Sequence, residues 1–327
     1  MPKNLITGAT GFAGSHLTKR LLSEGQDVKI LARPTSNIAR EELAGAEVCF
    51  GDLTHEDTAR RAVRNVETVY HLAAVFRRAG LSDSVYWSTN CEGTKNLLKA
   101  SMDAGVRRFV YCSTTGVLGH IADPPADERA PYNPGDVYQR SKCEAEQAVL
   151  RFHKEQGLPV TVIRPAAIYG PGDSRWLKLF KAVARRRFVM LGSGETFIHM
   201  VYISDLVDAF ISAAEKTNAV GQVYIVGGER YVTLNELTSI IAESVNVPAP
   251  KMHFPVKPVR IVSGACEDIC RFLHVEPPIF RRRVDFFVKN RAFDITKAKT
   301  ELDYLPKIDL DDGVSRTVRW YKEQGLL

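Results

Sequence analysis

The 327-residue sequence predicts an α/β protein in which a doubly wound parallel sheet carries a smaller, mostly helical lobe. Short apolar runs rich in β-branched residues alternate with longer segments whose apolar residues recur every three or four positions. This alternation is typical of β-α-β units, in which a helix connects each pair of parallel strands. The runs with the length of strands are Asn4–Thr7, Asp27–Ala32, Glu47–Phe50, Thr68–Leu72, Phe109–Cys112, Val160–Ile163 and Gln222–Val226.

The segments between these runs predict the crossover helices and a second lobe. Helical periodicity covers Gly14–Glu24, Thr89–Ala104 and Asp136–Gln156. After Arg164 the regular pattern ends at a glycine- and proline-rich loop, and proline-rich joints follow from about Tyr231. We therefore expect a main α/β domain in residues 1–165 and 197–227, a substrate lobe in residues 166–196 and 228–306, and a C-terminal helix in residues 307–327.

Composition excludes several classes of protein. The sequence is 45% hydrophobic and 25% charged, and it holds no apolar run long enough to cross a bilayer. Its first residues enter an apolar strand at once, which leaves no room for a secretion signal, so we expect a cytoplasmic protein. The net charge of +6 suits an anionic ligand, but the basic residues are too scattered to predict a nucleic-acid surface.

The six cysteines are dispersed and form no Cys-x-x-Cys pair, so neither a metal site nor a disulfide scaffold is expected. Cys266 and Cys270 lie four residues apart. We interpret them as small apolar residues on one face of a helix.

A glycine-rich turn between the first strand and the first helix predicts a dinucleotide site. Gly8 can form the tight turn, Gly11 lets the backbone approach a pyrophosphate, and Gly14 lets the helix pack closely on the strand. Glycine-rich turns also occur for steric reasons alone. Here the turn follows a strand at the start of an alternating chain, which favours a nicotinamide cofactor.

The residues after the second and third strands bear on which nicotinamide dinucleotide is bound. Ala32 occupies the position of the carboxylate that bonds a ribose 2′-hydroxyl, and Arg33 follows it. This favours NADP(H), with NAD(H) as the alternative if Arg33 only stacks on the adenine. Asp52, after the third strand, can accept a hydrogen bond from the adenine amino group or cap the helix that begins near Glu56.

Two groups of residues predict acid/base chemistry. Tyr138 and Lys142 are four residues apart on a predicted helix, so their side chains share one face. A neighbouring ammonium favours the phenolate, and we expect Lys142 to lower the pKa of Tyr138 and to hold the nicotinamide ribose. Ser113, Thr114 and Thr115 follow a strand at the edge where ligands of parallel sheets collect, although a turn of hydroxyl residues has the same composition.

Together these elements resemble the extended short-chain dehydrogenase/reductase family, also called the NAD-dependent epimerase/dehydratase family, whose sheet is of the Rossmann type. The resemblance covers almost the whole chain. The matching segments are Thr7–Gly14, Gly51–Leu53, His71–Ala74, Asn90 with Gly93 and Thr94, Phe109–Gly119, Tyr138 with Lys142, Arg164–Gly172 and Val201–Asp205.

The resemblance implies roles for individual residues. Tyr138 is the expected acid/base, Lys142 sets its pKa and binds the ribose, and Thr114 polarises the substrate oxygen. The family also implies a homodimer formed through helices such as 89–104 and 136–156. The cofactor is expected to be lined by Gly8, Thr10, Gly11, Phe12, Ala13, Gly14, Arg33, Asp52, Leu53, Ala73, Ala74, Tyr138, Lys142 and Pro165.

Departures from the family pattern narrow the reaction. Sugar dehydratases carry Asp-Glu after the catalytic Thr, whereas this chain has Thr115-Gly116. Nucleotide-sugar members also place an Asn where this chain has Ala167. Their Arg-containing diphosphate motifs correspond here to 195–199 and 285–290, where the arginines are missing. Arg281–Arg283 can replace those arginines as ligands of the diphosphate, but a solvated basic turn has the same pattern.

The second lobe favours a hydrophobic substrate. Apolar residues recur at helical spacing in Val259–Leu273, beside Pro277–Phe280, although a core-facing stripe has the same spacing. With Ala166-Ala167 and Arg291–Asp294, this lobe resembles the 3β-hydroxysteroid dehydrogenase and dihydroflavonol reductase branches. We expect hydride transfer between NAD(P) and a sterol- or flavonol-like alcohol or ketone. The alternatives are a nucleotide-sugar 4-epimerase and a non-catalytic dinucleotide-binding protein.

Overall fold

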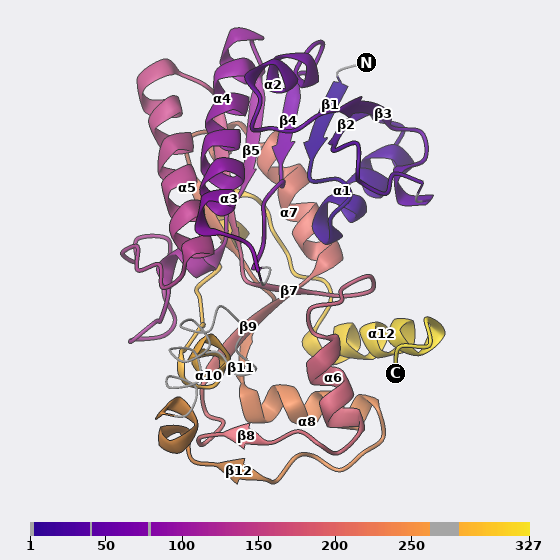
Figure 1. Ribbon diagram of the computed structural model, residues 1–327, viewed down its shortest axis with the longest axis vertical. Helices are drawn as coiled ribbons and strands as arrows, with labels where there is room; N and C mark the ends of the chain where they lie inside the picture. The colour runs from indigo at the N-terminus through magenta and orange to yellow at the C-terminus, as the bar shows by residue number, and fades with distance from the viewer. Residues whose placement is uncertain (1–2, 40, 78–79, 262–280) are drawn as a thin grey trace.

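The computed structural model describes residues 3–39, 41–77, 80–261 and 281–327. A seven-stranded parallel sheet forms the upper part of the molecule (Figure 1). Each of the seven predicted strands belongs to it, with ends that differ from the prediction by at most two residues. The strands are β1 (Lys3–Thr7), β2 (Asp27–Ala32), β3 (Glu47–Phe50), β4 (Thr68–His71), β5 (Arg108–Cys112), β6 (Val160–Pro165) and β10 (Val223–Val226).

The sheet is doubly wound around β1. The strand order is β10-β6-β5-β4-β1-β2-β3, so the chain first runs outward from β1 to β3 and then continues from β4 on the other side of β1. Ile6 of β1 is in register with Ile30 of β2 and with Tyr70 of β4. At this reversal the connections leave the carboxyl ends of β1 and β4 in opposite directions, which opens the crevice where ligands bind in such sheets.

Helices cover both faces of the large sheet. On one face lie α1 (Phe12–Ser23) and α7 (Ile203–Glu215), which pack against each other. On the other face α4 (Gly93–Asp103) packs between α2 (Glu56–Ala62) and α5 (Val137–Gln156). Successive side chains of β1 enter different cores, with Ile6 in the α1 and α7 layer and Leu5 in the α2, α4 and α5 layer. Both faces are therefore buried, as a parallel sheet requires.

The predicted helix Thr89–Ala104 is broken into shorter pieces. Helix α3 (Asp83–Tyr86) leads into a π-helical segment, η2 (Trp87–Glu92), and then into α4. The predicted helix Asp136–Gln156 is a single helix, α5. The Asp136 carboxylate accepts a 2.8 Å hydrogen bond from the Gln139 amide at its start, and Gly157 ends it with φ +78°.

A smaller lobe lies below the large sheet in Figure 1. It contains a three-stranded sheet of β7 (Ala167–Tyr169), β9 (Phe197–Tyr202) and β11 (Tyr231–Thr233), and a pair formed by β8 (Met190–Leu191) and β12 (His253–Phe254). Its helices are α6 (Leu177–Ala184), α8 (Leu234–Ser244) and α10 (Arg281–Val288). The C-terminal helix α12 (Leu310–Glu323) packs against α8, and both contribute to a third hydrophobic core.

The contacts of the lobe cross the predicted domain boundaries in two places. Strand β9 pairs with β7 and β11 but runs directly into α7 on the large sheet. Helix α11 (Thr296–Glu301) packs against β10, so the chain returns to the large sheet before it forms α12. The division at residues 166, 197, 228 and 307 stays a prediction.

Several sequence-based predictions fall outside the described residues. These include Cys266, Cys270, the segment 277–280 and most of the predicted apolar helix 259–273, and the description also excludes the side chains of Arg281–Arg283. Within the described ranges, no helix combines the length and apolar character needed to cross a membrane. The same ranges hold no cluster of three or more potential metal ligands.

Candidate active site

A cleft of about 1120 Å³ lies at the carboxyl ends of the central strands. The loops after β1, β4, β5 and β6 form its inner wall, together with the first turns of α5. Its outer wall comes from the smaller lobe, through residues near 175 and between 285 and 293. The cleft therefore occupies the place where an open α/β sheet binds its ligand.

The glycine turn after β1 is shaped for the close approach of a ligand. Gly8 has φ +77°, and the Gly11 amide donates to the Gly8 carbonyl at 2.9 Å. A Cβ atom on Gly14 would lie 2.1 Å from the Gly8 carbonyl oxygen, and one on Gly8 would lie 2.7 Å from the Ala73 nitrogen. Helix α1 therefore packs directly on the turn, with its first turn at the cleft. This arrangement fits the pyrophosphate of a dinucleotide.

The other predicted cofactor residues divide into two groups. Phe12, Ala13, Ala74 and Pro165 line the cleft beside the glycines. Thr10 lies in the same turn, between Gly8 and Gly11. By contrast, Ala73, Arg33, Asp52 and Leu53 are not part of the cleft lining. Arg33 is exposed directly after β2, where an elongated dinucleotide would place its adenosine end.

Asp52 does not cap helix α2, which was one of its two predicted roles. Its carboxylate accepts two 2.9 Å hydrogen bonds, from the amide and the hydroxyl of Thr54. The helix begins at Glu56, and its N-cap residue is His55, which lies three residues after Asp52. The Asp52 carboxylate bonds within its own turn instead, because an Asp side chain readily accepts a hydrogen bond from the backbone amide two residues ahead.

Lys142 is buried at the inner end of the cleft. Lys142 is only 2% exposed, and its Nζ donates to the Cys112 carbonyl at 2.6 Å. The same ammonium lies 4.1 Å from the centre of the Tyr111 ring. Burial lowers the pKa of Lys142 from 10.5 to about 8, since a low-dielectric site disfavours the charged form.

Tyr138 shares the cleft with Lys142, but its electrostatics differ from the prediction. Burial raises the pKa of the Tyr138 hydroxyl well above its ordinary value, and Cys112 adds to this effect. The positive charges that oppose the increase belong to Arg77 and Arg175. Lys142, whose Nζ donates to the Cys112 carbonyl, is not among the positive charges that lower the pKa of Tyr138.

Thr114 lies opposite this helix, at the end of β5. Its Oγ1 accepts a 3.0 Å hydrogen bond from the Gly116 amide and so caps the short 3-10 helix η3 (Thr115–Leu118). A hydroxyl that accepts from the backbone keeps its own proton available for another acceptor. Thr114 lines the cleft with Tyr138 and Lys142, so the three predicted catalytic side chains come together around one space.

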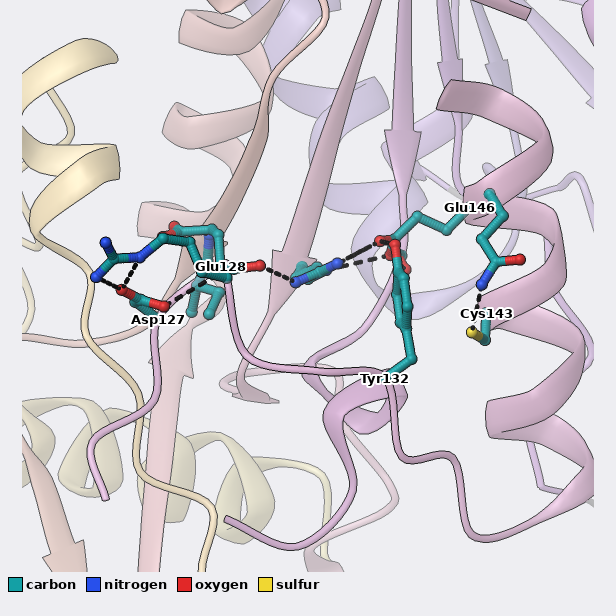
Figure 2. A network of polar contacts seen from close by, with 10 residues as sticks. Asp127, Glu128, Tyr132, Cys143 and Glu146 are labelled. Carbon is teal, nitrogen blue, oxygen red and sulfur yellow. Dashed lines mark hydrogen bonds and ion pairs between the residues drawn. The ribbon is translucent and has the colours of Figure 1, made fainter. Parts of the chain in front are cut away.

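A buried polar network beneath the cleft fixes α5 relative to the strands. Glu146 of α5 accepts hydrogen bonds from Arg164 of β6 at 2.6 Å and from Tyr132 at 2.7 Å (Figure 2). The Ser113 hydroxyl donates to the other oxygen of the same carboxylate. Glu146 and Arg164 are 0% and 3% exposed, so the pair is fully enclosed. This network ties the residue before Thr114 to the helix that carries Tyr138.

The cleft is also lined by residues that the sequence analysis did not assign to a site. Phe76 packs edge-to-face on the Tyr138 ring at 5.0 Å, and the Arg77 guanidinium lies 5.6 Å from the centre of that ring. Trp176, Lys289 and Arg291 complete the wall from the smaller lobe. The signal in the sequence was weak: Phe76 and Arg77 follow the recognised His71–Ala74 segment, but nothing in their spacing marks them.

Comparison with known proteins gives concordant matches. The model of the NAD dependent epimerase/dehydratase family matches residues 4–227. A 3β-hydroxysteroid dehydrogenase/Δ5→4-isomerase of Mycobacterium tuberculosis is 30% identical, over 97% of this chain and 90% of the relative. A decarboxylating sterol-4-α-carboxylate 3-dehydrogenase of Schizosaccharomyces pombe is 31% identical over 98% of each chain. A UDP-glucose 4-epimerase structure from Thermotoga maritima has a TM-score of 0.79 and 26% identity, covering 98% of this chain and 99% of that chain.

These matches confirm two predictions made from the sequence. The first is the resemblance to extended short-chain dehydrogenases and its 3β-hydroxysteroid dehydrogenase branch. The second is an enzyme of the NAD(P)-dependent oxidoreductase class, built on a doubly wound α/β sheet. The chain belongs to the NAD-dependent epimerase/dehydratase family.

Proposed function

We propose that this protein transfers a hydride between NADP(H) and a secondary alcohol or ketone of a hydrophobic, sterol-like substrate. The observation that carries the proposal is the meeting of Tyr138, Lys142 and Thr114 in the cleft that also contains the glycine turn. A non-catalytic dinucleotide-binding protein has no need to retain this trio. The nicotinamide, when bound, supplies the hydride acceptor or donor.

In this proposal each of the three residues has a separate task. Tyr138 takes the proton from the substrate hydroxyl during oxidation and returns it during reduction. Thr114 donates a hydrogen bond to the substrate oxygen and orients the carbinol. Lys142 leaves the Cys112 carbonyl to hold the ribose, which brings its positive charge to the Tyr138 side of the cleft and favours the phenolate.

Arg33 supports the choice of NADP(H) over NAD(H). It is exposed at the end of β2, and no carboxylate follows that strand at the position that would accept a ribose 2′-hydroxyl. A guanidinium there can form charge-assisted hydrogen bonds with a 2′-phosphate. Titration of the protein with NADPH and with NADH, followed by fluorescence, measures this preference directly.

Two observations support a hydrophobic substrate. Phe76, Trp176, Phe286 and Phe293 line the cleft, and two of the matched relatives are named as steroid or sterol dehydrogenases. Ala167 also lines the cleft and has no side-chain donor for a sugar diphosphate. The alternative is a nucleotide-sugar 4-epimerase, which is favoured by the likeness to the Thermotoga maritima structure.

Paired assays separate these two functions. Oxidation of a panel of hydroxysteroids is followed by the absorbance of NADPH or NADH, and epimerisation of UDP-glucose is followed by product analysis. We expect cofactor-linked turnover of at least one hydroxysteroid and no UDP-galactose. Efficient epimerisation without net change of the nicotinamide would replace our proposal with the epimerase.

Assembly and location remain proposals of the same kind. Helices α4 and α5 lie side by side on one face of the sheet (Figure 1), and we propose that they form the homodimer interface. We also propose a cytoplasmic location. Light scattering after size-exclusion chromatography tests the first, and fractionation of cells that produce the protein tests the second.

A further inference from the structure

Phe76 and Arg77 follow strand β4 and lie against the ring of Tyr138. Phe76 meets that ring edge-to-face at 5.0 Å, and the Arg77 guanidinium lies over it, 5.6 Å from its centre. A phenolate spreads its negative charge from the oxygen into the ring, so a cation over the ring attracts the deprotonated form more strongly than the neutral one. Arg77 is therefore placed to act on the ionisation of Tyr138, although it is not one of the three predicted catalytic residues.

Asp136 holds the Arg77 side chain in this position. One carboxylate oxygen accepts from the Arg77 Nε at 2.8 Å, and the other accepts from the Gln139 amide at 2.8 Å as the N-cap of α5. The same aspartate thus fixes both the guanidinium and the helix turn that carries Tyr138. The side chains of Arg77 and Asp136 are 27% and 24% exposed, so solvent screens their charges only in part.

The main chain before Arg77 is fixed as well. Asn90, a buried residue of the π-helical segment η2, accepts from the Val75 amide at 2.7 Å and donates to the Val75 carbonyl at 3.1 Å. The same side chain donates to the Ser141 hydroxyl at 3.0 Å, and that hydroxyl donates to the Tyr138 carbonyl at 2.9 Å. Asn90, which belongs to the segments that match the family pattern, therefore ties the chain next to Arg77 to the helix of Tyr138.

The charged and titratable groups that face Tyr138 come from several elements: Tyr111 and Cys112 on β5, Asp136 and Lys142 at the start of α5, Arg77 after β4, and Arg175 in the smaller lobe. Cys112 and Asp136 raise the pKa of the Tyr138 hydroxyl, whereas the two arginines lower it, and Arg77 contributes more than Arg175. The Lys142 ammonium is bonded to the Cys112 carbonyl at 2.6 Å. Among the described residues, Arg77 is therefore the cation that most favours the phenolate.

We infer that Arg77 is a positioning residue for the proposed reaction: paired with Asp136, it keeps a positive charge over the Tyr138 ring and stabilises the phenolate that accepts the carbinol proton. The inference rests on the proposed function, because it concerns the step in which Tyr138 acts as a base. In that step the proton leaves the substrate hydroxyl for the phenolate oxygen, and the hydride leaves the carbinol carbon for the nicotinamide, so that a ketone remains. Arg77 gives up no proton and makes the phenolate available before the step begins.

A purely structural role for Arg77 predicts a different result. The pair with Asp136 also joins the segment after β4 to the start of α5. Loss of that connection alone would lower the melting temperature and reduce turnover by the same factor at every pH. Loss of a charge that acts on Tyr138 would instead reduce turnover at low pH, where the phenolate is scarce, and leave it unchanged where the tyrosine is fully ionised.

The experiment follows the ionisation of Tyr138 in two ways. Oxidation of a hydroxysteroid at saturating NADP⁺ is measured over pH, and the midpoint of the rise in kcat/KM is recorded. Independently of activity, the complex with NADP⁺ is titrated by NMR with tyrosine labelled with carbon-13 at Cζ, and Tyr138→Phe assigns the signal.

Wild type is compared with two neutral variants and one charged variant of the same position. Arg77→Met removes the charge, Arg77→Gln removes the charge but can still donate to Asp136, and Arg77→Lys keeps the charge. The matched control is Arg129→Met. The Arg129 Nε donates to the Asp127 carboxylate at the same 2.8 Å, but its side chain is 92% exposed.

Both neutral variants should raise the pKa of Tyr138 by about 1 in the two measurements, so that turnover falls about tenfold at low pH and recovers at high pH. Arg77→Lys should retain at least half of the wild-type effect, and Arg129→Met should cause no shift. An unchanged NMR titration in the neutral variants, or a loss of turnover that is equal at every pH, would overturn the inference while the dehydrogenase function stands. If wild type oxidises no hydroxysteroid of the panel, the proposed function fails, and the inference fails with it.

Discussion

Replacement of Lys142 by Met is expected to abolish turnover and yet to stabilise the cofactor-free protein at neutral pH. The pKa of Lys142 falls from 10.5 to about 8 on folding because its ammonium is buried. A difference of this size corresponds to a cost of roughly 3 kcal/mol for keeping the lysine charged in the folded protein at pH 7. The lost hydrogen bond to the Cys112 carbonyl offsets about 1 to 2 kcal/mol of the gain. Lys142→Met should therefore be more stable than wild type by about 1 to 2 kcal/mol.

The pH dependence gives the sharper test. Below pH 8 the lysine is protonated in the folded and the unfolded chain, so the full free-energy cost of burying its charge is present. Between pH 8 and 10.5 the folded protein gives up the proton first, so the unfolded chain binds more protons and wild-type stability rises. By pH 9.5 the cost has fallen to about 1.5 kcal/mol, so the advantage of the variant should shrink by about 2 kcal/mol.

Urea unfolding at pH 7 and pH 9.5, without cofactor, measures both values. Other groups that titrate in this interval and do not interact with Lys142 are common to the two proteins, so they cancel when the difference between variant and wild type is taken. A difference in unfolding free energy that is equal at both pH values would refute the reasoning. So would a variant that is less stable than wild type at pH 7.

Four further substitutions test the remaining parts of the site. Tyr138→Phe removes the hydroxyl and keeps the ring, so turnover should fall by a factor on the order of 10² to 10⁴ with cofactor affinity retained; near-normal turnover contradicts its role. Arg33→Ala should weaken NADPH binding by roughly 1.5 to 3 kcal/mol and leave NADH unchanged, and equal losses for both would remove the case for a phosphate contact. Gly14→Ala places a Cβ against the Gly8 carbonyl and should cost about 3 kcal/mol of stability together with cofactor binding, whereas a fully stable variant would mean that helix and turn can separate freely. Glu146→Gln leaves the buried Arg164 without its countercharge and should cost roughly 3 kcal/mol in chemical denaturation; a loss under about 1 kcal/mol would show that the pair is dispensable.

Local pattern was sufficient to predict the sheet and the inner cleft. Alternating strand and helix periods located the large sheet, since both faces of each parallel strand are buried and its residues are accordingly apolar. The glycine turn was recognisable because its function needs a backbone that only glycine allows, as the contact between Gly14 and Gly8 illustrates. Tyr138 and Lys142 were found because both lie on one helix.

The remaining features depend on contacts between distant parts of the chain. The bond from Lys142 to the Cys112 carbonyl joins residues 30 positions apart, and no spacing rule reveals it. Arg77 and Arg291 line one cleft although more than two hundred residues separate them in sequence. Charge balance in a cleft is a property of the assembled fold, so a sequence with scattered cations does not disclose which of them come together.

The network around Glu146 also bears on how activity returns when the chain refolds. Its carboxylate joins α5 to Arg164 of β6, and Arg164 reaches on to the Glu128 carbonyl at 3.1 Å. Glu128 in turn accepts from the Ile225 amide at 2.8 Å, a partner 97 residues away. The network that holds Ser113 and α5 together thus extends to β10. Turnover should therefore be among the last signals to recover, after the far-ultraviolet signal of the helices.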